Sequence, residues 1–400
     1  MRRSTVPRRQ NGVRNKKRGV STKPCGPHQT LMEEFSGKAN KFNKVSHGTI
    51  APRLDNYLEP HETHMESLSK RLTIQLSPGD PEAGMKLFRI VNFKAFDEVL
   101  AFRYSPRKRR PRIACSEILK ALVFQKLERI PSWKALESKI AKAHVRRRIG
   151  LEKAIRNQRI SDFTRRIGPE GFKAIVIELS RQLRALIPDF GEEVAIDSTM
   201  VWAYANPYNE KNSDTDAKWG VKKLEAGKPI RTYGYKLHLT AEAKRDLAIW
   251  ELTSGANRHD SPFYPELLNG ACQQRQVKAS IADAAYDSKK NYHHTLKCKA
   301  APVIDYNRRR SKNKKGRRLD KEMPIQRGSP EWNSYAAKRS AVERAFSRLK
   351  ELGLETHLKL RTKDRVEVHF LLCIVTLLIL AFAAAVNGNP SLAGVEQWRD

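Results

Sequence analysis

The sequence predicts an α/β fold in which a mixed β-sheet, flanked by helices, is preceded by an all-α region. From about residue 61 to 190, apolar residues recur at helical spacing, with turn signals between the segments. After Pro188 the chain changes to short runs rich in β-branched residues, and helical segments alternate with the later runs. Strands that come first and then alternate with helices are typical of a mixed sheet covered by helices.

The expected strands are the runs EVAIDST, TYGYKLHLT, LAIWELTS, KASIADAAYD and AAPVID. Helices are expected around residues 262–274, around 289–299 and from 335 to 350. Residues 308–321, RRRSKNKKGRRLDK, are too charged to pack and are expected to form an exposed loop.

The chain carries a formal net charge of +34, far more than solubility requires. Such a field concentrates polyanions at the protein surface, and nucleic acid is the expected partner. An anionic membrane surface is the competing partner, but the basic residues are spread along the chain and not gathered on one amphipathic helix. We therefore expect a DNA-binding protein with no membrane partner.

These patterns divide the chain into four parts. Residues 1–60 form a disordered basic arm, 61–190 a helical DNA-binding domain, 191–387 the sheet domain and 388–400 a tail. The arm has many basic residues, hardly any apolar periodicity, and only Glu33 and Glu34 as acids in its first 50 residues. It is expected to contact phosphates without sequence preference, and the alternative is a solvated tail that only aids solubility.

The cysteines and the N-terminal sequence indicate the cellular compartment in which the protein is expected. The five cysteines are scattered and include no CxxC pair, so neither a disulfide framework nor a zinc ribbon is indicated. The start, MRRSTVPRRQ, lacks the apolar segment of a secretory signal. Cytoplasmic, nucleoid-associated localisation is the expectation.

An uncharged apolar run covers residues 370–386, FLLCIVTLLILAFAAAV. Its 17 residues lie at the lower edge of what spans a bilayer. Because the run ends in small residues and a sheet needs covering helices, we expect a buried core helix and not an anchor.

A helix, a short turn and a second helix are expected around residues 116–144. Pro131 disfavours helix in the residue before it, and Ser132 offers an N-cap to the next segment. Ser161 is expected to cap a further short helix, SDFTRRIG. Two basic clusters flank these helices and are expected to bind DNA, although solvated helix faces are the commoner explanation of such clusters. Their members are Arg107, Arg109, Arg110, Arg146, Arg147 and Arg148.

Three acids form the candidate catalytic set. Asp197 ends the apolar run VAID and Asp283 ends SIAD, where the first residues beyond a buried sheet normally meet a ligand. The alternative for each is an Asp that caps the next turn. The third acid, Glu343, shares one face of its expected helix with Arg339 and Lys350. An ordinary surface helix with an i, i+4 charge pair would show the same pattern.

Cutting a phosphodiester explains three acids among so many cations. The reaction needs a deprotonated oxygen nucleophile and a stabilised leaving oxygen, which two Mg²⁺ ions about 4 Å apart supply. Carboxylates are the hard oxygen ligands that Mg²⁺ prefers, and Mn²⁺ can substitute. Asp197 would bridge the ions, with Asp283 and Glu343 completing one each. Arg339 and Lys350 would bind the DNA backbone.

The order of these motifs adds a resemblance. The motifs are IDST at residues 196–199, YGYKLH at 233–238, GANRHDS at 255–261 and ADAAYD at 282–287. They lie between SDFTRR in the helical region and the R-x3-E-x6-K spacing of Arg339, Glu343 and Lys350. Over about residues 85–385 the chain resembles the DDE transposases of prokaryotic insertion sequences, in the branch with a Y-x2-R-x3-E-x6-K signature. It departs from that signature at Ala336, because the tyrosine stands one place earlier, at Tyr335.

The resemblance implies a ribonuclease-H-like catalytic domain that cleaves double-stranded DNA at the ends of an insertion sequence and joins them to target DNA. It also implies a homodimer on paired DNA ends and a DNA contact by Lys236 of the YGYKLH motif. Two alternatives stay open. One is a metal-dependent DNA nuclease without strand transfer, and the other is a catalytically retired transposase that only binds DNA.

Overall fold

The computed structural model describes residues 83–104, 113–209, 213–222, 229–307, 322–355 and 359–388. All of them belong to one compact unit, Leu68–Asp400. The basic arm, nearly all of the tail, the loop 308–321 and the side chains of Arg107, Arg109 and Arg110 lie outside the described residues.

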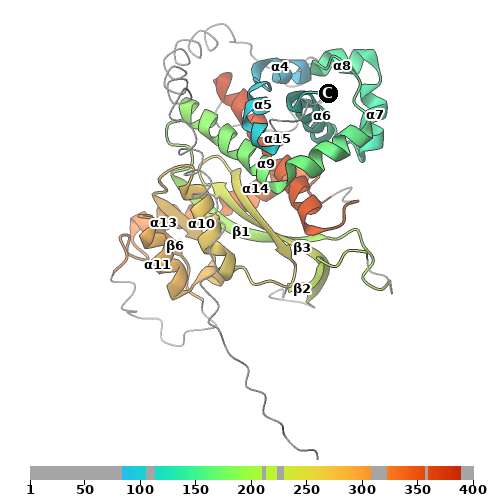
Figure 1. The fold of residues 1–400 in the computed structure, drawn as a ribbon. Helices are drawn as coiled ribbons and strands as arrows, with labels where there is room; N and C mark the ends of the chain where they lie inside the picture. Colours follow the sequence, from blue (N-terminus) through green and yellow to red (C-terminus); the bar gives the residue numbers. More distant parts are fainter. Residues whose placement is uncertain are drawn as a thin grey trace, which may run out of the picture. The chain divides into compact units, whose positions relative to one another are not determined.

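The described residues before the sheet are helical, as expected (Figure 1). The elements are α4 (Ala83–Ile90), α5 (Ala95–Val99), η1 (Ala101–Arg103), α6 (Cys115–Leu127), α7 (Trp133–Ile140), α8 (Ala143–Ile149) and α9 (Asn157–Leu186). The turn between α6 and α7 is the one that the sequence predicts, and the Ser132 hydroxyl accepts the backbone N–H of Ala135 as an N-cap.

The predicted helix start at Ser161 is wrong. Helix α9 begins at Asn157, so Ser161 lies inside it, and Thr164 donates its hydroxyl to the Ser161 carbonyl. The helix bends further on, at Gly168, whose φ of 60° interrupts the helical backbone directly before Pro169. Glycine suits this position because other residues adopt positive φ only at a cost.

Six strands form one mixed sheet. They are β1 (Glu193–Trp202), β2 (Lys218–Lys222), β3 (Ile230–Glu242), β4 (Leu247–Gly255), β5 (Ala279–Ala282) and β6 (Ala301–Ile304). The order is β2-β3-β1-β5-β6, and β4 also pairs with β3. Pairs among β1 to β4 are antiparallel, whereas β5 is parallel to β1 and to β6. This mixed sheet, flanked by helices and preceded by a helical region, confirms the expected ribonuclease-H-like fold.

Strand β2 was not expected from the sequence. Its sequence, KWGVK, is short, contains a glycine and shows no run of apolar residues. It pairs with the first residues of β3, and every side chain that it carries is exposed, because its buried residue is Gly220. This segment is therefore a strand because it pairs with β3, and its own composition does not predict a strand.

Helices that come later in the chain also cover the sheet. They are α10 (Tyr264–Cys272), α11 (Lys289–Lys297), α13 (Pro330–Ala336), η4 (Ala337–Arg339), α14 (Ser340–Glu351) and α15 (Lys363–Val386). The single helix expected from 335 to 350 is therefore wrong in detail, because the 3-10 turn η4 separates α13 from α14.

Helix α15 contains the apolar run that resembles a membrane span. Among the described helices it is the one long and apolar enough to cross a bilayer, with a mean hydropathy of 2.7 over its most apolar 18 residues. However, 89% of that window is buried inside the protein, where α15 packs along α9 and against β4. It is a core helix, as its alanine-rich end predicts.

Candidate active site

The first two acids of the predicted set lie side by side at one edge of the sheet. Strands β1 and β5 run parallel, and their register pairs Ile196 with Ala282. Asp197 and Asp283 are the residues that come next along the chain from this pair. Asp283 follows the last residue of β5, as expected, but the expected strand end at Asp197 is wrong, because β1 continues to Trp202 through its pairing with β3. Asp197 lies inside β1 at the point where the pairing with β5 ends, so two carboxylates separated by 86 positions of sequence become neighbours.

Burial and repulsion act together on Asp197. Loss of solvent raises the pKa of Asp197 to about 7, and the negative charges of Asp283 and Asp260 contribute to the rise. The N–H of Ser198, 2.7 Å from Asp197 Oδ1, and the positive charge of Arg339 oppose the rise. The positive charge around Asp197 is thus too small to stabilise its ionised form fully.

Asp283 is fixed by the turn that follows β5. Its carboxylate accepts the N–H of Ala285 at 2.8 Å and caps the 3-10 turn η3 (Ala284–Tyr286). The pKa of Asp283 is raised, first by burial and then by the negative charge of Asp260, while Arg339 opposes the rise. The two predicted roles, strand-end ligand and turn cap, are therefore both compatible with this position.

Asp287, four residues later, faces different groups. Its Oδ2 accepts the N–H of Asn307 at 2.9 Å, and the residue is buried. The cap of α11 is Ser288, whose hydroxyl accepts the N–H of Asn291. Asp287 therefore anchors the segment after β6, and the helix cap is the neighbouring serine.

Glu343 stands apart from the two aspartates. It lies in the first turn of α14 with 55% of its side chain exposed, and its carboxylate is 3.3 Å from the guanidinium of Arg339. Arg339 is in turn the cation that lowers the pKa of both Asp197 and Asp283. Helix α14 contacts β1, and η4 contacts both β1 and β5. Arg339 therefore links Glu343 electrostatically to the aspartate pair.

A fourth carboxylate, Asp260, was not singled out from the sequence. It accepts the hydroxyl of Ser198 at 2.7 Å and lies 3.0 Å from the ammonium of Lys236. An Asp directly before a helical segment indicates an N-cap, yet its side chain makes no capping hydrogen bond. The sequence feature that could have singled out Asp260 is its place in the GANRHDS motif, but the motif by itself assigns no role to this residue.

Lys236 lies inside this cluster. Only 8% of its side chain is exposed, and its ammonium donates to the Arg258 carbonyl at 2.8 Å as well as pairing with Asp260. The neighbouring His238 is fully buried, and burial lowers its pKa to about 4, so the ring is neutral near pH 7. Lys236 thus holds Asp260 in place and has little surface for a DNA contact.

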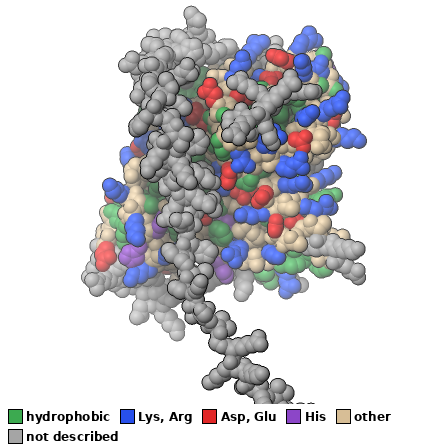
Figure 2. Space-filling view, viewed as in Figure 1, with side chains coloured by type: hydrophobic (Ala, Val, Ile, Leu, Met, Phe, Trp, Pro, Cys, Tyr) green, Lys and Arg blue, Asp and Glu red, His purple; other side chains and the backbone are tan. Residues whose placement is uncertain are grey.

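The remaining predicted DNA-binding residues lie elsewhere on the surface. Lys350 is exposed and pairs with Glu355 at 2.8 Å. Among the α8 residues, Arg147 is exposed, whereas Arg146 is half-buried and donates to the Ile140 carbonyl at 3.0 Å. Figure 2 shows Lys and Arg side chains spread over the visible face with acidic side chains among them. On this face the described cations are therefore mixed with acids.

The donor set fits divalent metal ions in part. Asp197 and Asp283 offer adjacent hard oxygen ligands whose raised pKa values show a shortage of positive charge. Glu343 directs its carboxylate at Arg339 instead, and no group of three acids, histidines or cysteines among the described residues stands close enough to hold an ion. Of the three expected ligands, Asp197 and Asp283 lie next to one another, and Glu343 is paired with Arg339.

Comparisons with known proteins place this site in context. Residues 188–379 match the family model described as the transposase DDE domain, and residues 74–166 match the transposase domain DUF772. The first match contains Asp197, Asp283 and Glu343, and the second contains the α6–α7 pair. No curated protein matches the chain in sequence.

Two solved structures are similar in part. One is the piggyBac transposase synaptic complex with hairpin DNA, 11% identical, with 80% of this chain and 78% of that chain covered at a TM-score of 0.38. The other is the Mos1 transposase paired-end complex with the left transposon end, 10% identical, with 72% and 82% covered at a TM-score of 0.19. Likenesses this slight add nothing to the fold already described.

Proposed function

We propose that this chain, a DDE transposase of the insertion-sequence type by its two matched domains, cleaves DNA at the ends of an insertion sequence and joins them to target DNA. The observation that carries the proposal is the pair Asp197 and Asp283, which come directly after the last paired residues of the parallel strands β1 and β5. A buried carboxylate with a pKa of about 7 and a second acid beside it is the arrangement that a cation-dependent centre requires.

The metal ligands in this proposal are Asp197, Asp283 and Glu343. Two bound Mg²⁺ ions, or Mn²⁺ in their place, would supply an activated oxygen nucleophile and stabilise the leaving oxygen. Asp197 gives up its proton more readily once positive charge is near, because its raised pKa reflects burial and like charges. Glu343 joins the set by leaving Arg339, whose fork of N–H groups is then free to bind a DNA phosphate.

Asp260 and Ser198 have a positioning role in this scheme. Ser198 donates its N–H to Asp197 and its hydroxyl to Asp260, so one residue connects the two carboxylates. The ammonium of Lys236 pairs with Asp260 at 3.0 Å. We propose that this network fixes the orientation of Asp197, and that the protein acts as a homodimer on double-stranded DNA in the cytoplasm, associated with the nucleoid.

The test is cleavage and joining by the purified full-length protein. The DNA on either side of the gene is first sequenced for inverted repeats, which are then placed on a plasmid with Mg²⁺ and separate target DNA. We expect strand cleavage at the repeats and joined products, both absent in Asp197→Asn and Glu343→Gln. Cleavage without joined products would support the nuclease alternative, and binding without cleavage would support the retired transposase.

A further inference from the structure

Exposed aromatic side chains gather at one end of the sheet. Among the described residues, every exposed large hydrophobic side chain except Phe102 lies on the last residue of β1, the segment after it, β2 or the first residue of β3. They are Trp202, Tyr204, Tyr208, Trp219, Val221 and Ile230. Clustered apolar exposure of this kind marks a binding surface more often than single exposed residues do.

Three of the rings form a connected series. Tyr208 is 82% exposed, and its ring centroid lies 6.0 Å from that of Trp219, which is 41% exposed. The Trp219 centroid lies 5.4 Å from that of Tyr233, its cross-strand partner on β3. Tyr233 is buried and donates its hydroxyl to the Asp214 carbonyl, so it fixes the inner end of the series. The rings are thus held in place from one side and open to solvent on the other.

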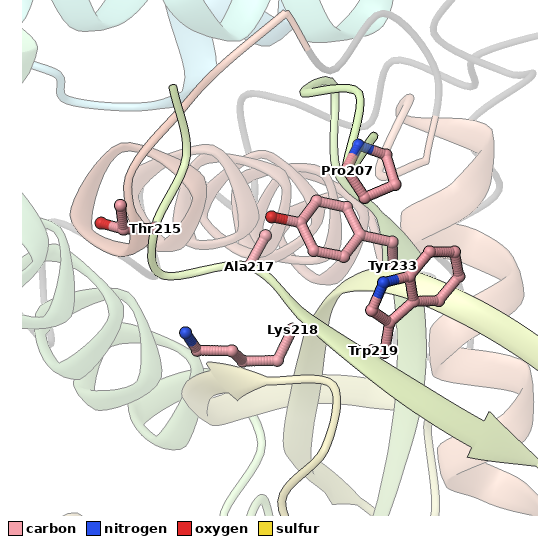
Figure 3. A pocket seen from close by; sticks show the side chains of 6 residues that line it. All are labelled: Pro207, Thr215, Ala217, Lys218, Trp219 and Tyr233. Atoms are coloured by element: carbon pink, nitrogen blue, oxygen red, sulfur yellow. The ribbon is translucent and has the colours of Figure 1, made fainter. Parts of the chain in front are cut away.

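A pocket of about 350 Å³ opens beside these rings. Figure 3 shows the side chains of Tyr233 and Trp219 next to one another on its wall, with Pro207 beside them. Thr215, Ala217 and Lys218 complete the lining. The pocket therefore offers flat apolar surfaces together with a cation.

Cations surround the aromatic series. Lys218, Lys222 and Arg231 are exposed on β2 and β3. The guanidinium of Arg361 lies 5.2 Å from the centre of the Tyr204 ring. Two acids also lie here, but their carboxylates accept backbone N–H groups at the start of α15, Asp214 from Thr362 at 3.2 Å and Asp216 from Lys363 at 2.9 Å. Aromatic rings alternate with positive charge over this surface.

Trp219 and Tyr233 lie on the same face of the sheet as Asp197. Asp197 pairs with Leu239 of β3, and Trp219 pairs with Tyr233, six residues before Leu239 on the same strand. Residues an even number apart on a strand point to one face. At about 3.3 Å per residue the aromatic series begins roughly 20 Å from Asp197. That is the length of about six base pairs of B-form DNA.

We propose that this aromatic and basic surface binds unpaired DNA bases, with Trp219 and Tyr208 as the stacking rings. The proposal rests on the proposed function in taking DNA as the substrate. In a duplex the faces of the bases are covered by their neighbours, so exposed rings gain nothing from duplex DNA, whereas an unpaired base can stack on them. The neighbouring lysines and arginines are suited to the phosphates that accompany such bases.

Charge argues against a second copy of the chain as the occupant. The cores of protein interfaces are depleted in charged residues, whereas cations alternate with the rings here. A chain of net charge +34 would also bring like charges together at such an interface. A polyanion with flat apolar faces is the ligand class that both features fit.

The test compares single-stranded and duplex DNA binding by the full chain in metal-free buffer, where no cleavage interferes. Labelled oligothymidylate and a labelled duplex are titrated by fluorescence anisotropy. Because each stacked base contributes about 1–3 kcal/mol, we expect Trp219→Ala and Tyr208→Ala each to weaken single-strand binding about 5-fold or more. Trp219→Phe should retain most of the affinity, and duplex affinity should change less than about 2-fold.

Ile230→Ala is the matched control, because Ile230 is exposed on the neighbouring strand but carries no ring. It should bind both DNAs as the unmodified protein does. Unchanged single-strand affinity in both alanine variants would overturn the proposal, as would equal losses for single-stranded and duplex DNA. A change of oligomeric state without a change in single-strand affinity would also overturn it. Failure of metal-dependent plasmid cleavage would instead count against the proposed function and leave this binding result unaffected.

Discussion

Asp283 and Asp287 lie four residues apart, yet the structure gives their carboxylates different partners. Asp283 follows β5 directly, and its pKa is raised by burial and by the charge of Asp260. Asp287 accepts the Asn307 N–H and ties down the segment after β6. Strand ends hold a carboxylate with the precision that a metal site requires, so Asp283 is the better ligand of the two.

At the residue scale we therefore predict that Asp283→Asn abolishes plasmid nicking under Mg²⁺ while DNA binding and folding remain nearly intact. The substitution removes the charge and keeps the shape of the side chain. Asp287→Asn should keep most of the activity, because the asparagine oxygen can still accept the Asn307 N–H. The measurement is nicking by each variant beside Asp197→Asn. An active Asp283→Asn protein together with an inactive but folded Asp287→Asn protein would reverse the assignment.

At the element scale, a buried charge network joins α9 to the sheet and to α15. The ammonium of Lys173 on α9 lies 2.7 Å from Glu367 Oε1 of α15 and 3.8 Å from Glu251 Oε1 of β4. Glu251 is fully buried, and its pKa is raised by loss of solvent and then by the charge of Glu367, while Lys173 opposes the rise. One lysine thus compensates two acids from separate elements.

We predict that Lys173→Met destabilises the fold by about 3–5 kcal/mol near pH 8, because the buried Glu251 loses its nearest cation and Glu367 keeps only the more distant Lys363, 3.9 Å away. The folded-state pKa of Glu251 lies above its unfolded value and rises further without Lys173. Stability is therefore lost as pH rises through that raised pKa, and the penalty should shrink toward pH 5, where Glu251 takes up a proton. Urea unfolding at both pH values measures it.

The matched control for this prediction lies on the same helix. Arg181 pairs with Glu178 at 2.7 Å, but the arginine side chain is 57% exposed. Exposed pairs contribute about 0–1 kcal/mol, so Arg181→Ala should cost little at either pH. An equal cost for the two variants, or a Lys173→Met penalty that grows toward pH 5, would contradict the proposed network.

At the scale of the whole molecule, the positive charge lies both on the described surface and in residues 1–50. The described surface carries cations mixed with acids, whereas residues 1–50 contain many lysines and arginines and few acids. Phosphate contacts by such an arm carry no sequence information, because every phosphate is alike. Recognition of particular sequences is then expected to stay with the helical region around residues 116–167.

We predict that removing residues 1–50 weakens binding to all duplex sequences alike. For every phosphate that the shortened protein no longer neutralises, the slope of log affinity against log salt concentration should become shallower by about 0.9. Titrations of inverted-repeat DNA and random DNA at several salt concentrations measure both effects. A truncated protein that no longer discriminates between the two DNAs would show that the arm contributes to specificity.

The sequence by itself determined the features that depend on local periodicity. The spacing of apolar residues predicted a helical region before the sheet and five of the six strands, and Pro131 with Ser132 placed the turn between α6 and α7. The small residues at the end of the apolar run indicated that α15 is a core helix, and its burial confirms this. Asp197 and Asp283 were recognisable because each directly follows a buried strand run.

Only the tertiary structure decided what depends on pairing between distant segments. KWGVK becomes β2 because it pairs with β3. Asp260 meets Ser198 because β3 pairs with both β1 and β4 and so brings the segment after β4 near β1. Lys236 points inward to Asp260. The sequence instead predicted that this lysine contacts DNA, as an exposed lysine of a strongly basic chain would. Side-chain direction and charge balance depend on neighbours far along the chain, and the period of a single segment does not contain that information.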